Sequence, residues 1–315
     1  MNAMSEIEAA EPIGPKARLS LTSLYELFES TPEPAWLVDD VAIEAQPLII
    51  GGAIKTLKTS VALDLAVSLA TGTEFLGRFR VPKRRRVAFF SGEGARATVK
   101  ETTERILRSK GKGVRAPEYA CHFAFALPRI GRASDRAELR RILKGERIGA
   151  VIFDPLYLCM RADGSTAGAM SNLYEVGPIL AATAEACADA GATPIFIHHT
   201  NKSAPSSRGT APNKKFSDSM TPIPPVELAD LALAGVGEFA RQWILLGRSE
   251  EYEPGSGRHD MNVTLGGAGR SAQLRLAIDE GRKCRSWKVS TTPHGPLTPH
   301  GPFPTCGPSA FGSPV

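Results

Sequence analysis

The chain has 315 residues, of which 42% are hydrophobic and 23% are charged. This composition is typical of a globular protein and excludes collagen-like, coiled-coil and wholly disordered chains. The net charge is +5, but residues 281–315 hold four basic residues and no acidic one, so the rest of the chain carries only about +1. Overall charge therefore does not by itself predict a nucleic-acid-binding protein.

The sequence contains no segment typical of a membrane span or a secretory signal. Its longest apolar runs are far shorter than the ~20 residues that a span requires, and the first 20 residues carry three glutamates. The five cysteines are scattered and form no C-x-x-C pair, which argues against a disulfide framework or a zinc site. We therefore expect a cytoplasmic protein with no membrane partner.

The first two hundred residues predict a parallel sheet with helices packed on it. Residues 1–17 are expected to form a disordered leader, and a short helical pattern covers residues 21–28. From residue 46 onward, apolar runs alternate with amphipathic stretches, which is typical of βαβ units. The expected strands are 47–50, 87–90, 150–153 and 194–197, and the expected helices are 58–70, 95–110, 136–144 and 172–189.

The last third of the chain has a different character. A polar segment at 201–225, too long for an ordinary connection, precedes a short predicted helix at 226–233. Strands expected at 243–246, 262–265, 274–278 and 287–289 would extend the sheet in antiparallel fashion. Residues 291–315 contain seven prolines and four glycines, which predicts a disordered tail. The predicted fold class is α/β, a mostly parallel sheet flanked by helices with a C-terminal antiparallel extension, in one domain at 18–290.

The strongest motif connects the first strand of this sheet to its first helix. Residues 52–59 follow the order G-x-x-x-x-L-K-T, close to the phosphate-loop pattern G-x-x-x-x-G-K-[ST]. In such a loop, backbone N–H groups surround a phosphate at a helix N-terminus. Lys58 would reach the β- and γ-phosphates, and the Thr59 hydroxyl would bind Mg²⁺. The expected nucleotide-binding residues are Gly51, Gly52, Ala53, Ile54, Lys55, Thr56, Leu57, Lys58, Thr59 and Ser60.

Leu57 departs from the phosphate-loop pattern because it stands where a glycine is usual. A leucine there must adopt a backbone conformation that glycine adopts freely, at a cost of roughly 1 kcal/mol. The alternative is a buried βα unit in which Lys58 and Thr59 follow each other by chance. The preceding strand and the apolar face of the following helix, at Val61, Leu65 and Leu69, favour a nucleotide site.

Two acidic residues follow later apolar strands. Asp154 ends the run Ile148–Phe153, which is the Walker B pattern, and would hold Mg²⁺ near Thr59. Glu93 follows the strand at 87–90 and lies between two glycines. At the carboxyl end of a parallel strand it would face the ligand crevice and orient the water that attacks the γ-phosphate. From spacing alone it is equally well explained as an acid that stabilises the dipole of the following helix.

His198 and His199 end the strand at 194–197. Strand periodicity places the two side chains on opposite faces of the sheet, so we expect only one of them to face the nucleotide, where it would sense the γ-phosphate. Two adjacent histidines without a third ligand do not make a metal site. A polar strand end that packs on loops is the alternative explanation.

These motifs, in this order, resemble the RecA-like P-loop ATPases. The likeness is closer to plasmid replication helicases of RepA type and related AAA family ATPases of mobile elements, with the DnaB helicases more distant. It covers about residues 30–290. The matching segments are Gly52–Ser60, Val87–Glu93, Ile148–Asp154, Ile197–Lys202 and Glu238–Arg248.

The resemblance implies an ATPase that uses ATP and Mg²⁺. It implies that Lys58 acts on the phosphates, that Glu93 is the catalytic base, and that His198 or His199 is the γ-phosphate sensor. An arginine near the fifth core strand would act in the neighbouring subunit, with Arg248 preferred over Arg241. The family usually forms hexameric rings with the ATP site at the subunit interface, so a homo-oligomer is expected.

Single-stranded DNA is the expected macromolecular partner. In RecA-like motors two loops face the central channel, and here they would be 157–171 and 201–222. The second loop suits non-specific backbone binding, with four basic residues against one acid, although a solvated loop is an equal alternative. The basic run at 78–86 is more typical of a solvated turn than of a DNA contact. Trp36 and Trp243 are expected in the core or at the adenine edge.

The sequence favours three functions in decreasing order. The first is an ATP-driven motor on single-stranded DNA, in replication or mobile-element maintenance. The second is a nucleotide-dependent switch with slow hydrolysis and a protein partner, which Leu57 and the nearly neutral body favour. The third, a small-molecule kinase, is disfavoured because the C-terminal strands do not suggest an arginine-bearing lid.

Overall fold

A computed structural model describes residues 21–116, 118–160, 173–201, 223–250, 252–267, 270–281 and 285–293. The chain divides into two units, Met1–Pro34 and Ala35–Val315. This division falls later than the predicted domain start at residue 18. The predicted leader at 1–17, and the predicted tail beyond residue 293, lie outside the described residues.

The first unit contains one described helix, α1 (Leu24–Ser30), where the sequence predicted a helix at 21–28. Ser23 caps it: the Glu26 N–H donates to the Ser23 hydroxyl, and the Glu26 carboxylate accepts from the Ser23 N–H. Such a capping box satisfies two backbone donors of the first turn. The capping box therefore explains why α1 begins at Leu24, directly after Ser23.

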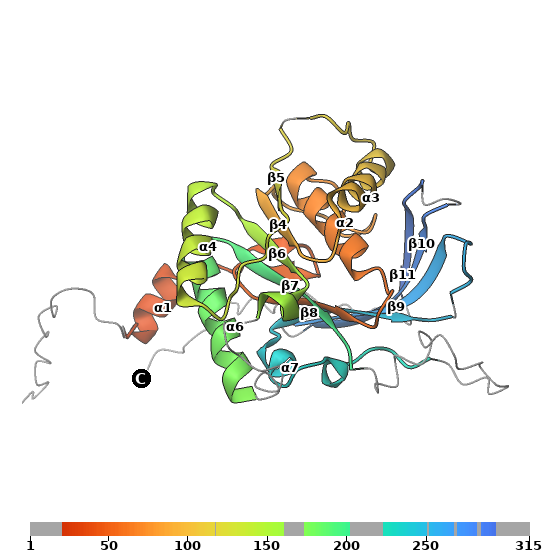
Figure 1. The fold of residues 1–315 in the computed structure, drawn as a ribbon. Helices are drawn as coiled ribbons and strands as arrows, with labels where there is room; N and C mark the ends of the chain where they lie inside the picture. Colours follow the sequence, from red (N-terminus) through yellow and green to blue (C-terminus); the bar gives the residue numbers. More distant parts are fainter. Residues whose placement is uncertain are drawn as a thin grey trace, which may run out of the picture. The chain divides into compact units, whose positions relative to one another are not determined.

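The described part of the second unit is built on a nine-stranded sheet with the order β11-β10-β9-β8-β3-β7-β6-β4-β5 (Figure 1). The six strands from β8 to β5 are parallel to one another, and β9, β10 and β11 are antiparallel. The predicted fold class is confirmed. The parallel strands are β3 (Leu48–Gly52), β4 (Val87–Ser91), β5 (Cys121–Ala124), β6 (Ala150–Asp154), β7 (Thr193–His199) and β8 (Gln242–Arg248); the antiparallel ones are β9 (Arg258–Gly267), β10 (Arg270–Asp279) and β11 (Lys288–Pro293).

Helices cover both faces of the parallel strands (Figure 1). Alternate strand residues enter two separate cores. Ile50 and Ile152 pack beneath α2 (Lys58–Thr71) and α3 (Arg96–Ser109). Ile49 and Val151 pack against α4 (Ala133–Gly145) and α6 (Leu173–Ala188). The central strands are thus buried on both sides, which explains their uninterrupted apolar runs. Shorter elements are the hairpin β1 (Trp36–Val38) and β2 (Ala42–Ile43), α5 (Leu156–Cys159), the 3₁₀ turn η3 (Leu228–Asp230) and α7 (Val236–Phe239).

The predicted helix at 226–233 is wrong. Only η3 forms there, because the backbone of the segment bonds to the end of β7. The Ala232 N–H donates to the His199 carbonyl, and the Asn201 N–H donates to the Asp230 carbonyl. An antiparallel bridge between Thr200 and Leu231 completes this connection. Backbone groups used in this way are not available for a helix.

Two further differences concern strands at the edges of the sheet. The sequence analysis did not identify β5, whose short, incompletely buried run carries no clear alternation. At the other edge, β11 continues to Pro293, three residues into the predicted tail, because it pairs with β10 as far as Leu274. Within the described residues no helix is long and apolar enough to cross a membrane.

Candidate functional site

The phosphate loop begins where β3 ends and closes where α2 begins. A Cβ atom on Gly51 would lie 2.6 Å from Leu231 Cδ2, and one on Gly52 would lie 2.5 Å from the Leu246 carbonyl oxygen. Both positions therefore require the close backbone approach that only glycine allows. The two glycines at the end of β3 thus pack directly on Leu231 and on the backbone of Leu246 in β8.

Leu57 adopts the left-handed conformation that the sequence predicted. Its φ and ψ are 57° and 24°, and it caps the N-terminus of α2. Lys55 also has a positive φ, of 63°. Two non-glycine residues in this region store backbone strain within one loop. Leu57 compensates in part because its side chain packs against the core beneath α2.

Lys58 is buried at the first position of α2, with only 6% of its surface exposed. Its ammonium donates to the carbonyls of Gly52, at 2.9 Å, and of Ala53, at 2.6 Å. Burial lowers the pKa of Lys58 to about 8, although the charges of Asp154 and Glu93 oppose this shift. The lysine thus draws the start of the loop around its own helix N-terminus, where free N–H groups and a positive charge meet.

Asp154 lies at the end of β6, on the same side of the sheet as α2, and is 3% exposed. Burial raises the pKa of Asp154 to about 6, and the hydrogen bond from the Thr59 hydroxyl and the charge of Lys58 lower it. Thr59 and Asp154 are thus adjacent, as predicted from their motifs. A hydroxyl and one carboxylate beside a phosphate site are the protein ligands that Mg²⁺ uses together with phosphate oxygens and water. The described residues contain no cluster of three or more acids, histidines or cysteines that would form a metal cage of another type.

Glu93 follows β4, whose last residue Ser91 pairs with Asp154. The Tyr157 hydroxyl donates to Glu93 Oε1 at 2.5 Å, and this bond raises the pKa of Tyr157 to about 12. The Glu93 carboxylate is close enough to influence the pKa of Lys58 and of Asp154. The sequence analysis did not identify Tyr157. Its only signal is its position three residues after the Walker B aspartate.

The two histidines point to opposite sides of the sheet, as strand periodicity predicted. His198 is buried on the side of α6, where its Nε2 donates to the Ala232 carbonyl at 2.6 Å, and burial lowers its pKa to about 4. His199 is partly buried on the other side, with its ring centroid 5.7 Å from that of Tyr157. Burial and the charge of Lys58 lower the pKa of His199. His199 is therefore the histidine that lies with the phosphate loop.

The two candidate arginines have very different surroundings. Arg248 is buried at the end of β8 and donates to the Lys55 carbonyl of its own phosphate loop at 2.6 Å. The preference for Arg248 as a finger into the neighbouring subunit stays a prediction that this burial does not favour, because a finger must be exposed to reach another chain. Arg241 is exposed just before β8, at the end of the strands opposite the phosphate loop. It remains the candidate for an intersubunit contact.

The basic run at 78–86 is consistent with a solvated turn. Three of its arginines form ion pairs within the chain: Arg80 with Asp39, Arg85 with Glu44, and Arg86 with Glu146. The run precedes the first residue of β4, so it lies at the amino ends of the parallel strands, whereas Asp154 lies at their carboxyl ends. Of the predicted channel loops at 157–171 and 201–222, residues 157–159 belong to helix α5, and residues 161–171 and 202–222 lie outside the described residues.

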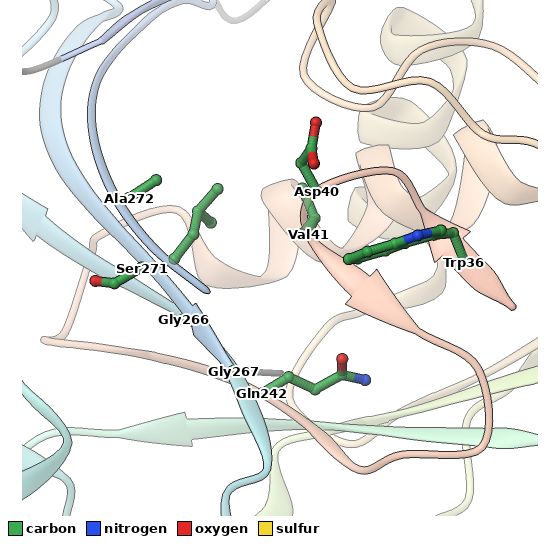
Figure 2. Close-up of a pocket in the computed structure, with 9 residues that line it drawn as sticks. Trp36, Asp40, Val41, Gln242, Gly266, Gly267, Ser271 and Ala272 are labelled. Atoms are coloured by element: carbon green, nitrogen blue, oxygen red, sulfur yellow. The ribbon is translucent and has the colours of Figure 1, made fainter. Parts of the chain in front are cut away.

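Trp36 and Trp243 lie away from the phosphate loop. Trp243 packs on the backbone of Gly266, where a Cβ would come within 2.2 Å of the indole ring. Trp36 lines a cavity of about 20 Å³ with Asp40, Gln242 and Ser271 (Figure 2). The cavity lies at the start of β8, whereas the phosphate loop follows the opposite end of the neighbouring strand β3, so the cavity is not part of the nucleotide site. Of the two predicted places, the structure supports packing rather than an adenine edge.

The match to a protein family agrees with this geometry. The family of AAA domains designated AAA_25 matches residues 14–205, which is more than half of the chain. A KaiC-like protein from the hyperthermophilic archaeon Pyrococcus horikoshii OT3 is similar in structure, with a TM-score of 0.48 and 14% sequence identity over 81% of this chain and 93% of that chain. No curated protein matches the sequence. The chain belongs to the AAA_25 family of AAA domains and is a nucleotide-binding P-loop ATPase.

Proposed function

We propose that the chain is a Mg²⁺-dependent ATPase of RepA-helicase type that acts on single-stranded DNA as a homo-oligomer, with a hexameric ring as the expected form. One observation carries the catalytic part. Lys58, Thr59, Asp154, Glu93 and His199 come from four different strand ends and meet on one side of the sheet. In open α/β sheets, ligands bind at the carboxyl ends of the strands.

Each residue has a role that fits its surroundings. The N–H groups at the start of α2 bind the phosphates, and Lys58 binds the β- and γ-phosphates. Thr59 and Asp154 hold Mg²⁺, which when bound neutralises the charge that develops on the transferred phosphoryl group. Glu93 accepts a proton from the attacking water. His199 senses the γ-phosphate, because it is the histidine beside Lys58 and Tyr157.

The oligomer would complete the site. Glu93 is exposed, so the water-attack side of the site opens to solvent within one subunit. An arginine from a neighbouring copy would supply the missing positive charge, and Arg241 is the remaining candidate. DNA would bind the predicted loops at 157–171 and 201–222. The first of these segments begins at Tyr157, in the short helix α5, and Tyr157 contacts Glu93, so DNA bound there would act close to the proposed catalytic base.

A regulatory switch with slow hydrolysis and a protein partner is the second candidate function. The hydrogen bond from Tyr157 to Glu93 favours it, because the Tyr157 hydroxyl occupies Glu93 Oε1 and leaves less of the carboxylate available to accept a proton from water. Strain in the phosphate loop at Leu57 favours it as well. Both functions require ATP binding at the same loop, and they differ in what stimulates turnover.

The experiment is ATP hydrolysis by the purified chain with and without single-stranded DNA. Three variants accompany it: Lys58→Ala, the double variant Lys214→Ala/Lys215→Ala, and the control Lys83→Ala/Arg84→Ala. The control removes two exposed cations at the amino ends of the parallel strands, away from the phosphate loop. Three results together support the motor: DNA raises turnover in the parent chain, Lys58→Ala abolishes turnover, and the Lys214→Ala/Lys215→Ala variant keeps basal turnover but loses the salt-dependent stimulation by DNA, which the control variant retains. Slow turnover that DNA does not change supports the switch. ATP binding that persists in Lys58→Ala refutes the site.

A further inference from the structure

Arg248 occupies an unusual position for a strand-end arginine. β8 runs parallel to β3, and Leu246 pairs with Gly52, so Arg248 extends two residues beyond the point where the phosphate loop starts. Its side chain is 4% exposed, and its Nη2 donates to the Lys55 carbonyl at 2.6 Å. The contact is therefore made to the backbone of the loop, at one of its two left-handed residues.

The orientation of that carbonyl decides the orientation of the next amide. In a planar trans peptide, the carbonyl of Lys55 and the N–H of Thr56 point in opposite directions. Since Arg248 binds the Lys55 carbonyl, the Thr56 N–H is turned away from Arg248. The Thr56 hydroxyl donates to the Ala53 carbonyl at 2.8 Å and thus holds the same turn from within. A loop without its usual glycine has few other means of keeping this conformation.

A stack of aromatic rings holds Arg248 in place. Its guanidinium lies 4.9 Å from the ring centroid of Tyr252, which stacks on His259 with a centroid distance of 4.7 Å and an angle of 6°. His259 Nε2 lies 3.1 Å from Glu280 Oε2, and Glu280 also pairs with Arg105 of α3. A buried cation over an aromatic face is a favourable, orienting contact. These contacts connect α3, through Glu280 just after β10, His259 of β9 and Tyr252 just before β9, to Arg248 and the phosphate loop.

The hydrogen bonding of Arg248 does not favour a purely stabilising role. Its Nη1 is buried and has no hydrogen-bond partner among the described residues. A buried donor without a partner costs free energy, and an apolar side chain of similar volume would often be as stable or more stable at such a position. The arginine is thus better explained by what it does to the loop than by what it adds to the fold.

We propose that Arg248 is a positioning residue for the ATP site of its own subunit, which fixes the Lys55 carbonyl so that the Thr56 amide faces the phosphates, while the Tyr252–His259 stack orients Arg248. This inference rests on the proposed nucleotide site. Arg248 itself does not touch the reacting atoms, and its effect reaches the phosphates through the backbone of the loop.

The experiment measures MgATP affinity, turnover and thermal stability in the full chain. Arg248→Met should weaken ATP binding about 10- to 100-fold, the value of one charged hydrogen bond, while its melting temperature stays equal or rises. The same variant should raise KM far more than it lowers kcat at saturating ATP. Arg248→Lys should recover part of the affinity, because a lysine keeps the charge and one donor.

Two further variants separate positioning from a general structural effect. Tyr252→Phe keeps the ring and should bind ATP as the parent does, whereas Tyr252→Ala should bind it about 2- to 30-fold more weakly. The matched control is Arg258→Ala, an exposed arginine at the start of β9, which should change nothing. ATP affinity in Arg248→Met within twofold of the parent, or affinity that falls only in proportion to stability, overturns the proposal. A parent chain that does not bind ATP overturns the proposed function instead.

Discussion

Replacing Leu57 by glycine and by alanine tests the left-handed conformation of the phosphate loop directly. Both substitutions remove the side chain beyond Cβ, which packs partly against the core beneath α2. Both therefore lose a similar amount of apolar burial. They differ in the backbone, because glycine adopts a φ of 57° without a penalty and alanine does not.

The expected difference can be worked out from this conformation. A left-handed conformation costs a non-glycine residue roughly 1–2 kcal/mol. Glycine also loses more conformational entropy than alanine on folding, and this loss cancels part of the stability difference between the two variants. Leu57→Gly should therefore be more stable than Leu57→Ala by about 1 kcal/mol, and for a domain of this size this corresponds to about 2–4 °C in melting temperature.

The assay is thermal unfolding of the two variants, with a matched pair elsewhere as the control. Glu101 is exposed inside α3, where the backbone is helical. There the order must reverse: Glu101→Ala should be more stable than Glu101→Gly by about 1 kcal/mol. If Leu57→Ala is as stable as Leu57→Gly while the control behaves as expected, residue 57 is not left-handed in solution, and the argument for a strained loop is refuted.

The other predictions concern the chemistry of the site. Glu93→Gln should keep ATP affinity and lose about 10²–10⁴ in turnover; an equal loss of affinity, seen in a binding titration, would assign Glu93 a structural role. Tyr157→Phe should raise basal turnover several-fold, because the bond to Glu93 is removed; unchanged single-turnover rates would contradict this. Because burial raises the pKa of Asp154 to about 6, protons should compete with Mg²⁺ as the pH falls through 6. The apparent Mg²⁺ affinity, read from binding of a fluorescent ATP analogue, should fall below that pH by up to about tenfold per pH unit more steeply in the parent than in Asp154→Asn, because only the phosphates of the analogue still titrate in the variant.

The sequence predicted the parallel part of the fold well because burial on two faces leaves a simple signal. The runs that became β3, β4, β6 and β7 are apolar throughout, and each ends in a polar or glycine residue at the ligand edge. The segment at 226–233 has a helical pattern of apolar residues as well. That pattern predicted a helix that does not form, because the backbone of the segment is hydrogen-bonded to the end of β7, about 30 residues earlier in the chain. Periodicity carries no information about such a partner.

The same limit applies to the site. Lys58, Thr59 and Asp154 belong to local motifs, and the structure brings them together where the motifs predicted. Arg248 was assigned to the neighbouring subunit from the family resemblance, and its place in the sequence does not tell whether its side chain faces outward or inward. The deciding facts are its burial and the Lys55 carbonyl, a contact between residues 193 positions apart. Tyr157 was missed for a related reason, since its partner Glu93 lies 64 positions away.

The antiparallel extension supports the phosphate loop and its helix at two separate points, which explains why an ATP site needs strands beyond the parallel sheet. At the first point, β9 and β10 hold the stack that orients Arg248. At the second, the indole of Trp287, just before β11, donates to the buried Asp64 of α2 at 2.7 Å. Lys110, at the end of α3, pairs with the other Asp64 oxygen at 3.1 Å. An unpaired buried carboxylate is costly, so α2 is held in register with the extension and with α3. Because α2 begins at Lys58, any shift of the extension along the helix would move the residue that we propose binds the phosphates.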